Sequence, residues 1–238
     1  MSLEVFYVTA GIACTQQFLD MGFNHLMMSA YSITKQSAGC PNKMALMKGT
    51  TWILDSGMIS AWRNRDPAWA NRQDHIAALA RKHHPSYVSH LDMPVERHFL
   101  QTNHISKADA LESSYQNALM FLDADVDGAK KIFVLQGWDI DDYQRCFRDF
   151  DDAGILDACE SDGHWLGVGT MCLRKPTQGI FQICESIRRW TGGIHLHVFG
   201  VGQKSYQKRL DQIGIDSTDT ASFMLNNMVF GGHKHEVH

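Results

Sequence analysis

The sequence predicts a (β/α)8 TIM barrel, in which eight parallel strands close into a cylinder surrounded by helices. Short apolar runs alternate with helical patterns about eight times along the chain, which is typical of a parallel sheet. The 238 residues are close to the length of one barrel, and no repeat or Gly/Ser-rich linker divides them. We therefore expect a single domain over residues 1–238, with a doubly wound open sheet as the alternative architecture.

The strand candidates are short apolar runs with turn signals on both sides. The sixth strand is ambiguous, because Ile155–Cys159 and Trp165–Val168 are both short and apolar. The other seven candidates are, in chain order, Glu4–Val8, His25–Ala30, Thr51–Leu54, Tyr87–Leu91, Lys131–Leu135, Ile194–Phe199 and Gly214–Asp216.

Helical spacing of apolar residues marks the segments between these runs. The first of them opens after Asp66-Pro67, since proline suits the first turn of a helix. The helices expected from this spacing are Trp69–Lys82, Lys107–Leu122, Asp139–Phe150, Pro176–Trp190 and Ser205–Ile213.

Composition narrows the class of protein. Apolar residues make up 44% of the chain, enough for a sizeable core, and no apolar run approaches the ~20 residues of a membrane span. The six cysteines include no CxxC pair, which indicates reduced thiols in a cytoplasmic protein rather than a zinc or disulfide framework. The net charge of −4 gives no global case for nucleic acid, so any phosphate contacts would come from local basic clusters. The candidate clusters are Arg63 and Arg65, Arg174 and Lys175, and Lys204, Lys208 and Arg209.

Polar groups follow successive strand candidates. A carboxylate just past a buried strand is poorly placed for packing and well placed for chemistry, because burying a charge is costly. In a barrel, all such positions face the same end of the cylinder and form a pocket there. The groups are Asp55, Asp92, Gln136-Gly137, the turn Gly167-Val168-Gly169, and Asp216 with Asp219.

Each group also has an ordinary structural interpretation. Asp55 before Ser56-Gly57 suits a turn, and Asp92 before Met-Pro suits a helix cap. Gln136-Gly137 suits a plain strand exit, and Asp219, Asp216 or Ser217 suits the cap of a helix over Thr220–Asn227. Five such groups at successive strand ends favour a functional site.

These residues resemble the tRNA-guanine transglycosylases and their relatives that insert 7-deazaguanines into DNA. The family's Asp-Ser-Gly-Gly motif is similar to Asp55-Ser56-Gly57, with Met58 at the second glycine. The other similarities follow in family order over residues 51–221. The family's Val-Gln-Gly is similar to Leu135-Gln136-Gly137, and its Ala-Ile-Gly-Gly-Leu turn is similar to Trp165–Gly169. Its Gly-Val-Gly is similar to Gly200-Val201-Gly202, and its Gly-Val-Asp-x-Phe-Asp is similar to Gly214–Asp219.

The resemblance implies a pentosyltransferase that exchanges one base for another. Asp219 would attack C1′ of a guanosine nucleotide to give a covalent glycosyl-enzyme, with Asp55 as general acid and then general base. Asp92 would bind N1–H and the amino group of the base, while Gln136 and the Gly167–Gly169 backbone would bind the O6 side. Ser56 and Gly137 join this base-binding set through their motifs. No cofactor or metal is implied.

Departures from the resemblance narrow the substrate. The tRNA enzymes carry a cysteine–histidine zinc cluster after the nucleophile, whereas no cysteine follows Asp219 here. Their Pro-Thr-Arg is replaced by Thr220-Ala221-Ser222, and an RNA-binding domain is not evident. We therefore expect DNA rather than tRNA as the polymer and a free 7-deazaguanine as the second substrate. A homo-oligomer or an accessory nucleic-acid-binding protein would be compatible, and a membrane partner is not expected.

Two other functions fit parts of the sequence. His195-Leu196-His197 places two histidines on one face of a strand, where they could share a metal in a barrel hydrolase. A base-binding accessory subunit without turnover is the non-enzymatic alternative, although Asp219 is present where such a protein would have lost its nucleophile.

Overall fold

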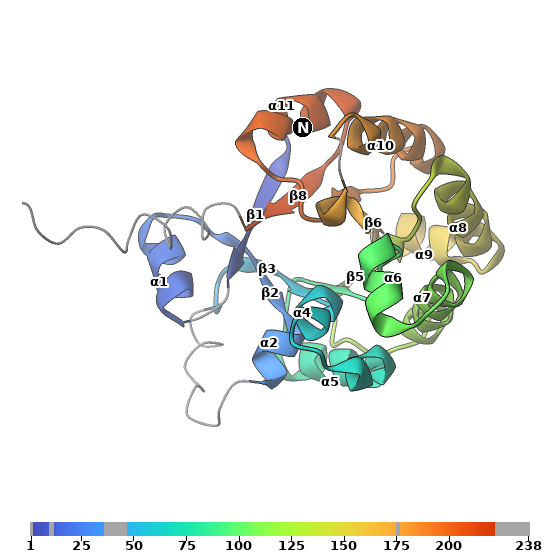
Figure 1. Cartoon of the computed structure of the whole chain (residues 1–238). Coiled ribbons are helices and arrows are strands. Elements are labelled where there is room, and N and C mark those ends of the chain that lie inside the picture. Colours follow the sequence, from blue (N-terminus) through green and yellow to red (C-terminus); the bar gives the residue numbers. More distant parts are fainter. Residues whose placement is uncertain (1, 10–11, 36–46, 175–176, 222–238) are drawn as a thin grey trace, which may run out of the picture.

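The computed structural model describes residues 2–9, 12–35, 47–174 and 177–221, and these ranges form a closed parallel barrel. Each strand pairs in parallel with the next, and β1 pairs with β8 to close the cylinder. The TIM-barrel prediction is confirmed, and the open-sheet alternative is wrong (Figure 1). The strands are β1 (Glu4–Thr9), β2 (His25–Ser29), β3 (Thr51–Asp55), β4 (Tyr87–Ser89), β5 (Lys130–Leu135), β6 (Trp165–Val168), β7 (Leu196–Val198) and β8 (Ser217–Thr220).

Helices surround the strands, with α4 and α6 in front of them in the view of Figure 1. Ser106 caps α7 and Asp139 caps α8 through side chains that accept backbone N–H bonds, so local sequence sets where these helices start. The described α-helices are α1 (Ile12–Asp20), α2 (Ala30–Thr34), α4 (Met58–Arg63), α5 (Gln73–His83), α6 (Arg97–Asn103), α7 (Lys107–Leu122), α8 (Ile140–Asp152), α9 (Ile155–Asp162), α10 (Thr177–Thr191) and α11 (Lys204–Ile213). Two 3-10 helices, η1 (Pro67–Asn71) and η2 (Met171–Leu173), complete the set.

The sixth and eighth strands differ from part of the prediction. Trp165–Val168 forms β6, whereas Ile155–Cys159 belongs to α9. Gly154 and Gly163, both in the left-handed conformation, mark the two ends of that helix. The eighth strand is Ser217–Thr220 rather than Gly214–Asp216. Its four residues are polar but buried, because pairing with β1 and β7 places them inside the closed barrel.

The helix predicted at Trp69–Lys82 starts later than expected. Pro67–Asn71 forms the 3-10 helix η1, and α5 begins at Gln73 after a bend at Arg72. The Asp66-Pro67 signal therefore marks the first of two short helices rather than one long one.

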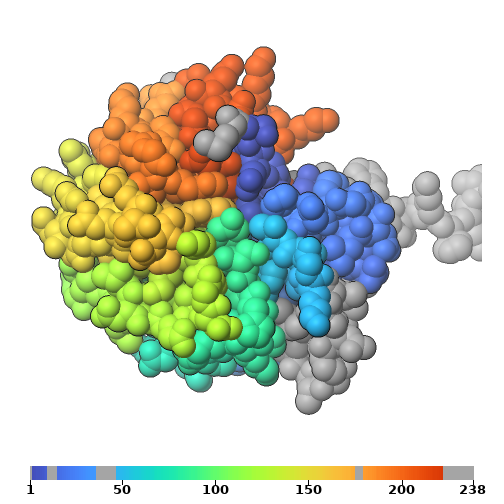
Figure 2. Space-filling model, turned by 180° about the vertical axis from the view of Figure 1, so that it is seen from behind, coloured from blue at the N-terminus to red at the C-terminus, as the bar shows by residue number. Residues whose placement is uncertain are grey.

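Two layers of apolar side chains hold the fold. One lies between the strands and the helices, and the smaller one fills the barrel interior. The interior layer is rich in aromatic rings. Phe6 lies edge-on to Tyr87 and Trp165, whose own rings are tilted against each other with centroids 3.7 Å apart. Met27, Ile53 and Ile132 complete this layer, which we call the barrel floor. Seen from behind, the successive segments meet at the centre of the molecule (Figure 2).

No helix in the described ranges has the length and apolar character needed to cross a membrane.

Candidate active site

Side chains two residues apart on a strand point to the same face, and this alternation brings the chemically important side chains to one end of the barrel. Ile53 lies in the floor, so Asp55, two residues further along β3, points to the same interior at the carboxyl end of that strand. The same alternation carries Gln136 beyond Ile132 of β5. Asp219 pairs across from Phe6 in β8 and is 3% exposed. The barrel mouth above the floor is therefore lined by acids and an amide.

A tight turn fixes Asp55-Ser56-Gly57 at this mouth. Gly57 has φ 82°, and a Cβ there would lie 2.6 Å from the Tyr31 nitrogen, so the turn requires glycine. The Asp55 carboxylate accepts a bond from the Gly57 N–H at 3.1 Å, as the turn interpretation expected. The Trp69 indole also donates to the Ser56 carbonyl at 2.9 Å. The turn role of Asp55 is thus real and coexists with its position among the other carboxylates.

A hydrogen-bond network joins four strand ends around Asp92. Ser56 Oγ donates to Asp92 Oδ1 at 2.9 Å, and the Gln136 amide nitrogen donates to Oδ2. Thr170 Oγ donates to the Gln136 amide oxygen at 2.6 Å, which fixes the orientation of the amide. The alternative interpretation of Asp92 as a helix cap is wrong, because Glu96 caps the next helix, α6. Asp92, Ser56 and Gln136 therefore form one preorganised polar wall.

The carboxylates are close enough to affect each other's ionisation. Burial, followed by the negative charges of Asp92 and Asp219, raises the pKa of Asp55 from 3.8 to about 7. Burial also raises the pKa of Asp92, although bonds from Ser56 and Gln136 oppose this. Asp55 is thus suited to both donate and accept a proton near neutral pH.

We expect Asp55→Asn to stabilise the fold increasingly as pH rises. A folded-state pKa above the unfolded value contributes stability at low pH that is lost as pH rises through about 7. The isosteric amide does not ionise, so the variant should gain up to about 4 kcal/mol over the native protein between pH 4 and pH 8. Urea denaturation of both proteins across this range measures the difference.

Asp66→Asn is the control with the opposite sign. The pKa of Asp66 is lowered by a hydrogen bond from Lys35, so neutralising Asp66 should weaken the fold slightly at neutral pH. A pH-independent stability difference for Asp55→Asn would contradict the raised pKa.

Gly167 in β6 and Gly169 just after it allow neighbouring side chains to approach the backbone closely. A Cβ on Gly169 would lie 2.2 Å from the Gln136 amide nitrogen, and one on Gly167 would lie 2.7 Å from the Phe199 ring. The Gly169 N–H already donates to the Leu135 carbonyl at 3.0 Å, so this glycine supplies room rather than a free donor. Val168 is buried between the strands and the helices.

Gly137 belongs to the packing of α8 rather than to the wall around Asp92. A Cβ there would lie 2.8 Å from the Tyr143 ring and 2.9 Å from Asp142. Tyr143 in turn donates to the Gly169 carbonyl at 2.7 Å. The glycine therefore lets α8 approach and support the strand ends that carry the site.

Asp219 lies in β8 itself, not in a turn after it. The Gly200 N–H donates to its Oδ1 at 2.7 Å, and His197 Nε2 lies 3.4 Å from the same oxygen. The alternative helix cap over Thr220–Asn227 falls largely outside the described residues. Within them, this carboxylate is held from β7, which explains why the Gly200-Val201-Gly202 turn follows that strand.

Asp216 is not at the mouth, and that part of the prediction is wrong. Its carboxylate accepts bonds from Arg188 at 2.9 Å and from the Leu196 N–H at 2.8 Å. It precedes β8, whereas Asp219 lies near the carboxyl end of that strand. One strand length therefore separates a structural ion pair at one end of the barrel from the site at the other.

Sequence reasoning missed several residues at the mouth. Thr170 has φ 60°, unusual for a β-branched residue, and bonds both Gln136 and the Val95 N–H. Ser29 Oγ is buried and lacks a hydrogen-bond partner within the described structure. Cys172 is exposed but close to the mouth, and its protein surroundings together with the charges of the nearby carboxylates raise the pKa of its thiol to about 12. None of these residues belongs to a recognisable motif. The sequence contains a signal for Ser29 alone, through its place in the alternation of side chains along a predicted strand.

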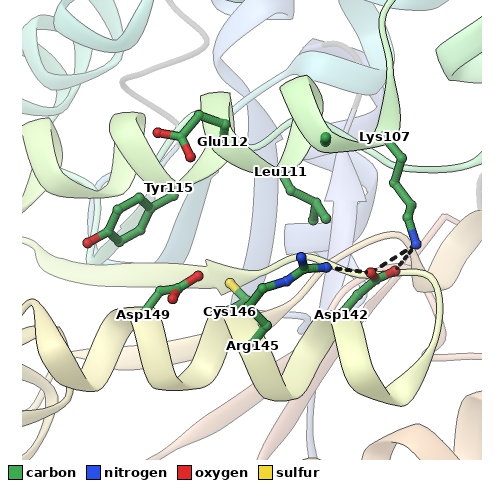
Figure 3. Close-up of a pocket in the computed structure, with 9 residues that line it drawn as sticks. Lys107, Leu111, Glu112, Tyr115, Asp142, Arg145, Cys146 and Asp149 are labelled. Atoms are coloured by element: carbon green, nitrogen blue, oxygen red, sulfur yellow. Dashed lines mark hydrogen bonds and ion pairs between the residues drawn. The ribbon is translucent and has the colours of Figure 1, made fainter.

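A groove of about 330 Å³ lies on the outer wall between α7 and α8 (Figure 3). Lys107 and Arg145 both bind Asp142 there, at 2.9 Å and 3.1 Å. Burial acts to raise the pKa of Asp142, but the Lys107 bond and backbone donors lower it overall. The groove thus has paired charges and lies away from the carboxylates of the mouth.

His195 and His197 share one face of β7, as the alternation predicted. Both contact Ser217 Oγ at 2.9 Å, and His195 stacks on Trp165 at 3.6 Å. In the described part of the chain, no three His, Cys, Asp or Glu side chains are grouped as a metal site. The hydrolase alternative therefore has no ligand set here beyond the histidine pair.

A protein-family model described as DpdA, DeoxyPurine in DNA protein A, matches residues 25–235. The match includes every mouth residue named above, from Ser29 to Asp219. No match was found among curated proteins.

Proposed function

The chain belongs to the DpdA family of DNA-modifying transglycosylases, and we propose that it exchanges guanine in DNA for a 7-deazaguanine base. One observation carries the proposal. Asp55, whose pKa is raised to about 7, shares the barrel mouth with the partly buried Asp92 and the buried Asp219. An acid–base group and a second carboxylate are what cleavage at an anomeric carbon with a covalent intermediate requires.

In the first half of the reaction, an oxygen of Asp219 attacks C1′ of the target nucleotide. The C1′–N9 bond breaks, its electron pair leaves with guanine, and protonated Asp55 supplies the proton that the departing base takes up. The product is an ester between Asp219 and the deoxyribose, and the guanine is free.

In the second half, the incoming 7-deazaguanine reverses these steps. Ionised Asp55 removes the proton from its N9, which attacks C1′, and the C1′–O bond of the ester breaks. The Asp219 carboxylate and protonated Asp55 are thereby regenerated, so atoms and charge balance over one exchange.

The polar wall recognises the base. Guanine presents N–H donors beside an oxygen acceptor on one edge. The Asp92 carboxylate is positioned to accept from those donors, and the Gln136 amide, oriented by Thr170, is positioned to donate to the oxygen. The absence of a side chain at Gly169 lets Gln136 lie where it meets both Asp92 and Thr170.

The target nucleotide must leave the DNA stack to reach this mouth. Arg174 near the rim supplies positive charge, donating to the Gly137 carbonyl at 3.3 Å with its guanidinium 4.5 Å from the exposed Trp138 ring. A cation beside an exposed indole suits a phosphate and an unstacked base.

Exchange of labelled guanine, run in parallel on duplex DNA, single-stranded DNA and tRNA, tests the proposal. We expect label to enter DNA and not tRNA, and an adduct with DNA that survives denaturation. Label in tRNA alone would overturn the choice of polymer, and no exchange or adduct with any of them would overturn the reaction.

Asp92→Ala should mainly weaken base binding. The variant removes the acceptor for the N1–H and amino donors, and we expect affinity for the free base to fall about a hundredfold, since losing a partner of a buried charged hydrogen bond costs about 1.5–3 kcal/mol. Titration calorimetry with 7-deazaguanine measures this.

Gly169→Ala tests the same wall from the other side. Its Cβ would displace Gln136, so base affinity should fall although both acids remain. Unchanged affinity in both variants would remove the polar wall from base recognition.

A further inference from the structure

A line of polar side chains crosses the interior of the barrel between β7 and β8 and ends at Asp219. His195 Nε2 and His197 Nδ1 both lie 2.9 Å from Ser217 Oγ, and His197 Nε2 lies 3.4 Å from Asp219 Oδ1. We refer to His195, Ser217, His197 and Asp219 as the interior chain. Its members other than His195 are fully or almost fully buried, with His197 and Ser217 at 0% exposure.

His197 Nε2 has no hydrogen-bond partner among the described residues, although its atom is buried. A buried polar nitrogen without a partner is costly, and the Asp219 carboxylate is the acceptor next to it. At 3.4 Å the contact is longer than a usual N–H···O bond and does not have the geometry of one. Such bonds at catalytic groups often tighten only when substrate is bound.

The Ser217 hydroxyl has one hydrogen to donate, which sets the direction of the chain. If it donates to His197 Nδ1, it accepts from His195 Nε2–H, and His197 then carries its proton on Nε2, facing Asp219. In the opposite direction, a His197 ring protonated on Nδ1 alone would present a bare Nε2 to a carboxylate, which is repulsive. Burial lowers the pKa of His195 to about 4, so that ring is neutral and carries a single N–H.

We propose that the interior chain makes His197 a positioning residue that donates its Nε2–H to Asp219 Oδ1 and so leaves Oδ2 to bond the deoxyribose. This inference rests on the proposed base exchange. The Gly200 N–H donates to the same Oδ1, so both described donors reach one oxygen and distinguish it from the other.

The two donors have a chemical consequence. Hydrogen bonds to a charged carboxylate are stronger than those to the neutral carbonyl of an ester. The donors therefore stabilise free Asp219 relative to the glycosyl ester, which makes Asp219 a better leaving group in the second half-reaction. Loss of the His197 donor should accordingly let the ester accumulate, an effect that mere loosening of the site would not produce.

Single-turnover measurements on the full chain, with a guanine-containing DNA strand and labelled guanine as probes, test this. For His197→Leu we expect ester breakdown to slow by on the order of a hundredfold, the usual effect of losing one aimed donor, with ester formation changed much less. His197→Gln retains an N–H at a similar reach and should restore breakdown to within about tenfold of native.

His90→Leu is the matched control, since His90 is also fully buried but packs among Phe121, Phe133 and Phe150 instead of facing a carboxylate. It should lower stability without altering the ratio of the two rates. Equal slowing of both steps in His197→Leu, or equal behaviour of the Leu and Gln variants, would overturn the proposal.

Imidazole ¹⁵N spectra of the native protein provide a readout that does not depend on turnover. Nε2 of native His197 should carry a proton, and Ser217→Ala should lower the fraction of His197 rings protonated on Nε2. A bare Nε2 in the native protein overturns the proposal. If native protein forms no DNA adduct, the proposed function fails; if it forms one and the His197 variants match it, only this inference fails.

Discussion

Asp219→Asn is expected to abolish the covalent adduct with DNA and to reduce base exchange by at least about 10⁴-fold, since a missing nucleophile typically has an effect of this size. The amide oxygen can still accept the Gly200 N–H bond, so the geometry of the site should be preserved. The variant therefore removes nucleophilic charge with little change of shape.

Denaturing gel analysis of labelled DNA measures the adduct, and label incorporation measures the exchange. Asp157→Asn is the control, because Asp157 is an exposed carboxylate on α9, away from the mouth. A native level of adduct in Asp219→Asn would assign the nucleophile to another residue, and Asp55 would be the first to test.

Asp55→Asn should reduce exchange by about 10²–10⁴-fold, the usual contribution of a positioned acid–base group. Unlike Asp219→Asn, this variant retains the nucleophile and should still form some adduct, slowly. Asn can neither protonate the departing base nor deprotonate the incoming one, so both half-reactions should suffer.

The pH profile of the native protein should identify Asp55 directly. Its pKa is about 7, so adduct formation, which uses the protonated acid, should fall as pH rises above that value. Adduct breakdown by an incoming base uses the ionised form and should rise up to that value. Overall exchange then has its maximum near pH 7, measured by single-turnover rates between pH 5 and pH 9.

Asp55→Asn should lose both limbs of this profile. A profile that persists unchanged in the variant would place the titrating group elsewhere, and Asp92, whose pKa is also raised by burial, would be the candidate.

Most of the barrel could be predicted because its signals are local. Apolar runs marked most of the strands, and Trp165–Val168 could have been chosen over Ile155–Cys159 from helical spacing, since Ile155, Leu156 and Cys159 are the buried residues of α9. β8 could not be predicted from local signals, because Ser217–Thr220 has no apolar residue and is a strand only through its pairing with β1 and β7.

The site shows the same division. Asp55, Asp92 and Gln136 were found because they follow apolar runs, and Asp219 was found through its motif near the predicted eighth strand. The structure gathers them at one mouth. Asp216 was misplaced because the predicted strand Gly214–Asp216 lay three residues before β8, which put Asp216 at the end of the strand instead of before its start. The contact of His197 with Asp219 depends on which strands are neighbours, and the histidine pair had suggested only a metal.

The barrel floor, which includes Phe6, Tyr87 and Trp165, affects how substrates enter the site and how products leave it. These rings and the apolar side chains beside them fill the interior below the mouth in the described part of the barrel, so we expect both bases and the DNA strand to enter from the mouth. Expelled guanine has to depart while the sugar is still tethered to the protein, before its replacement can come in. The two free bases must therefore occupy the site one after the other. A surplus of free guanine should compete with the 7-deazaguanine and return guanine to the DNA.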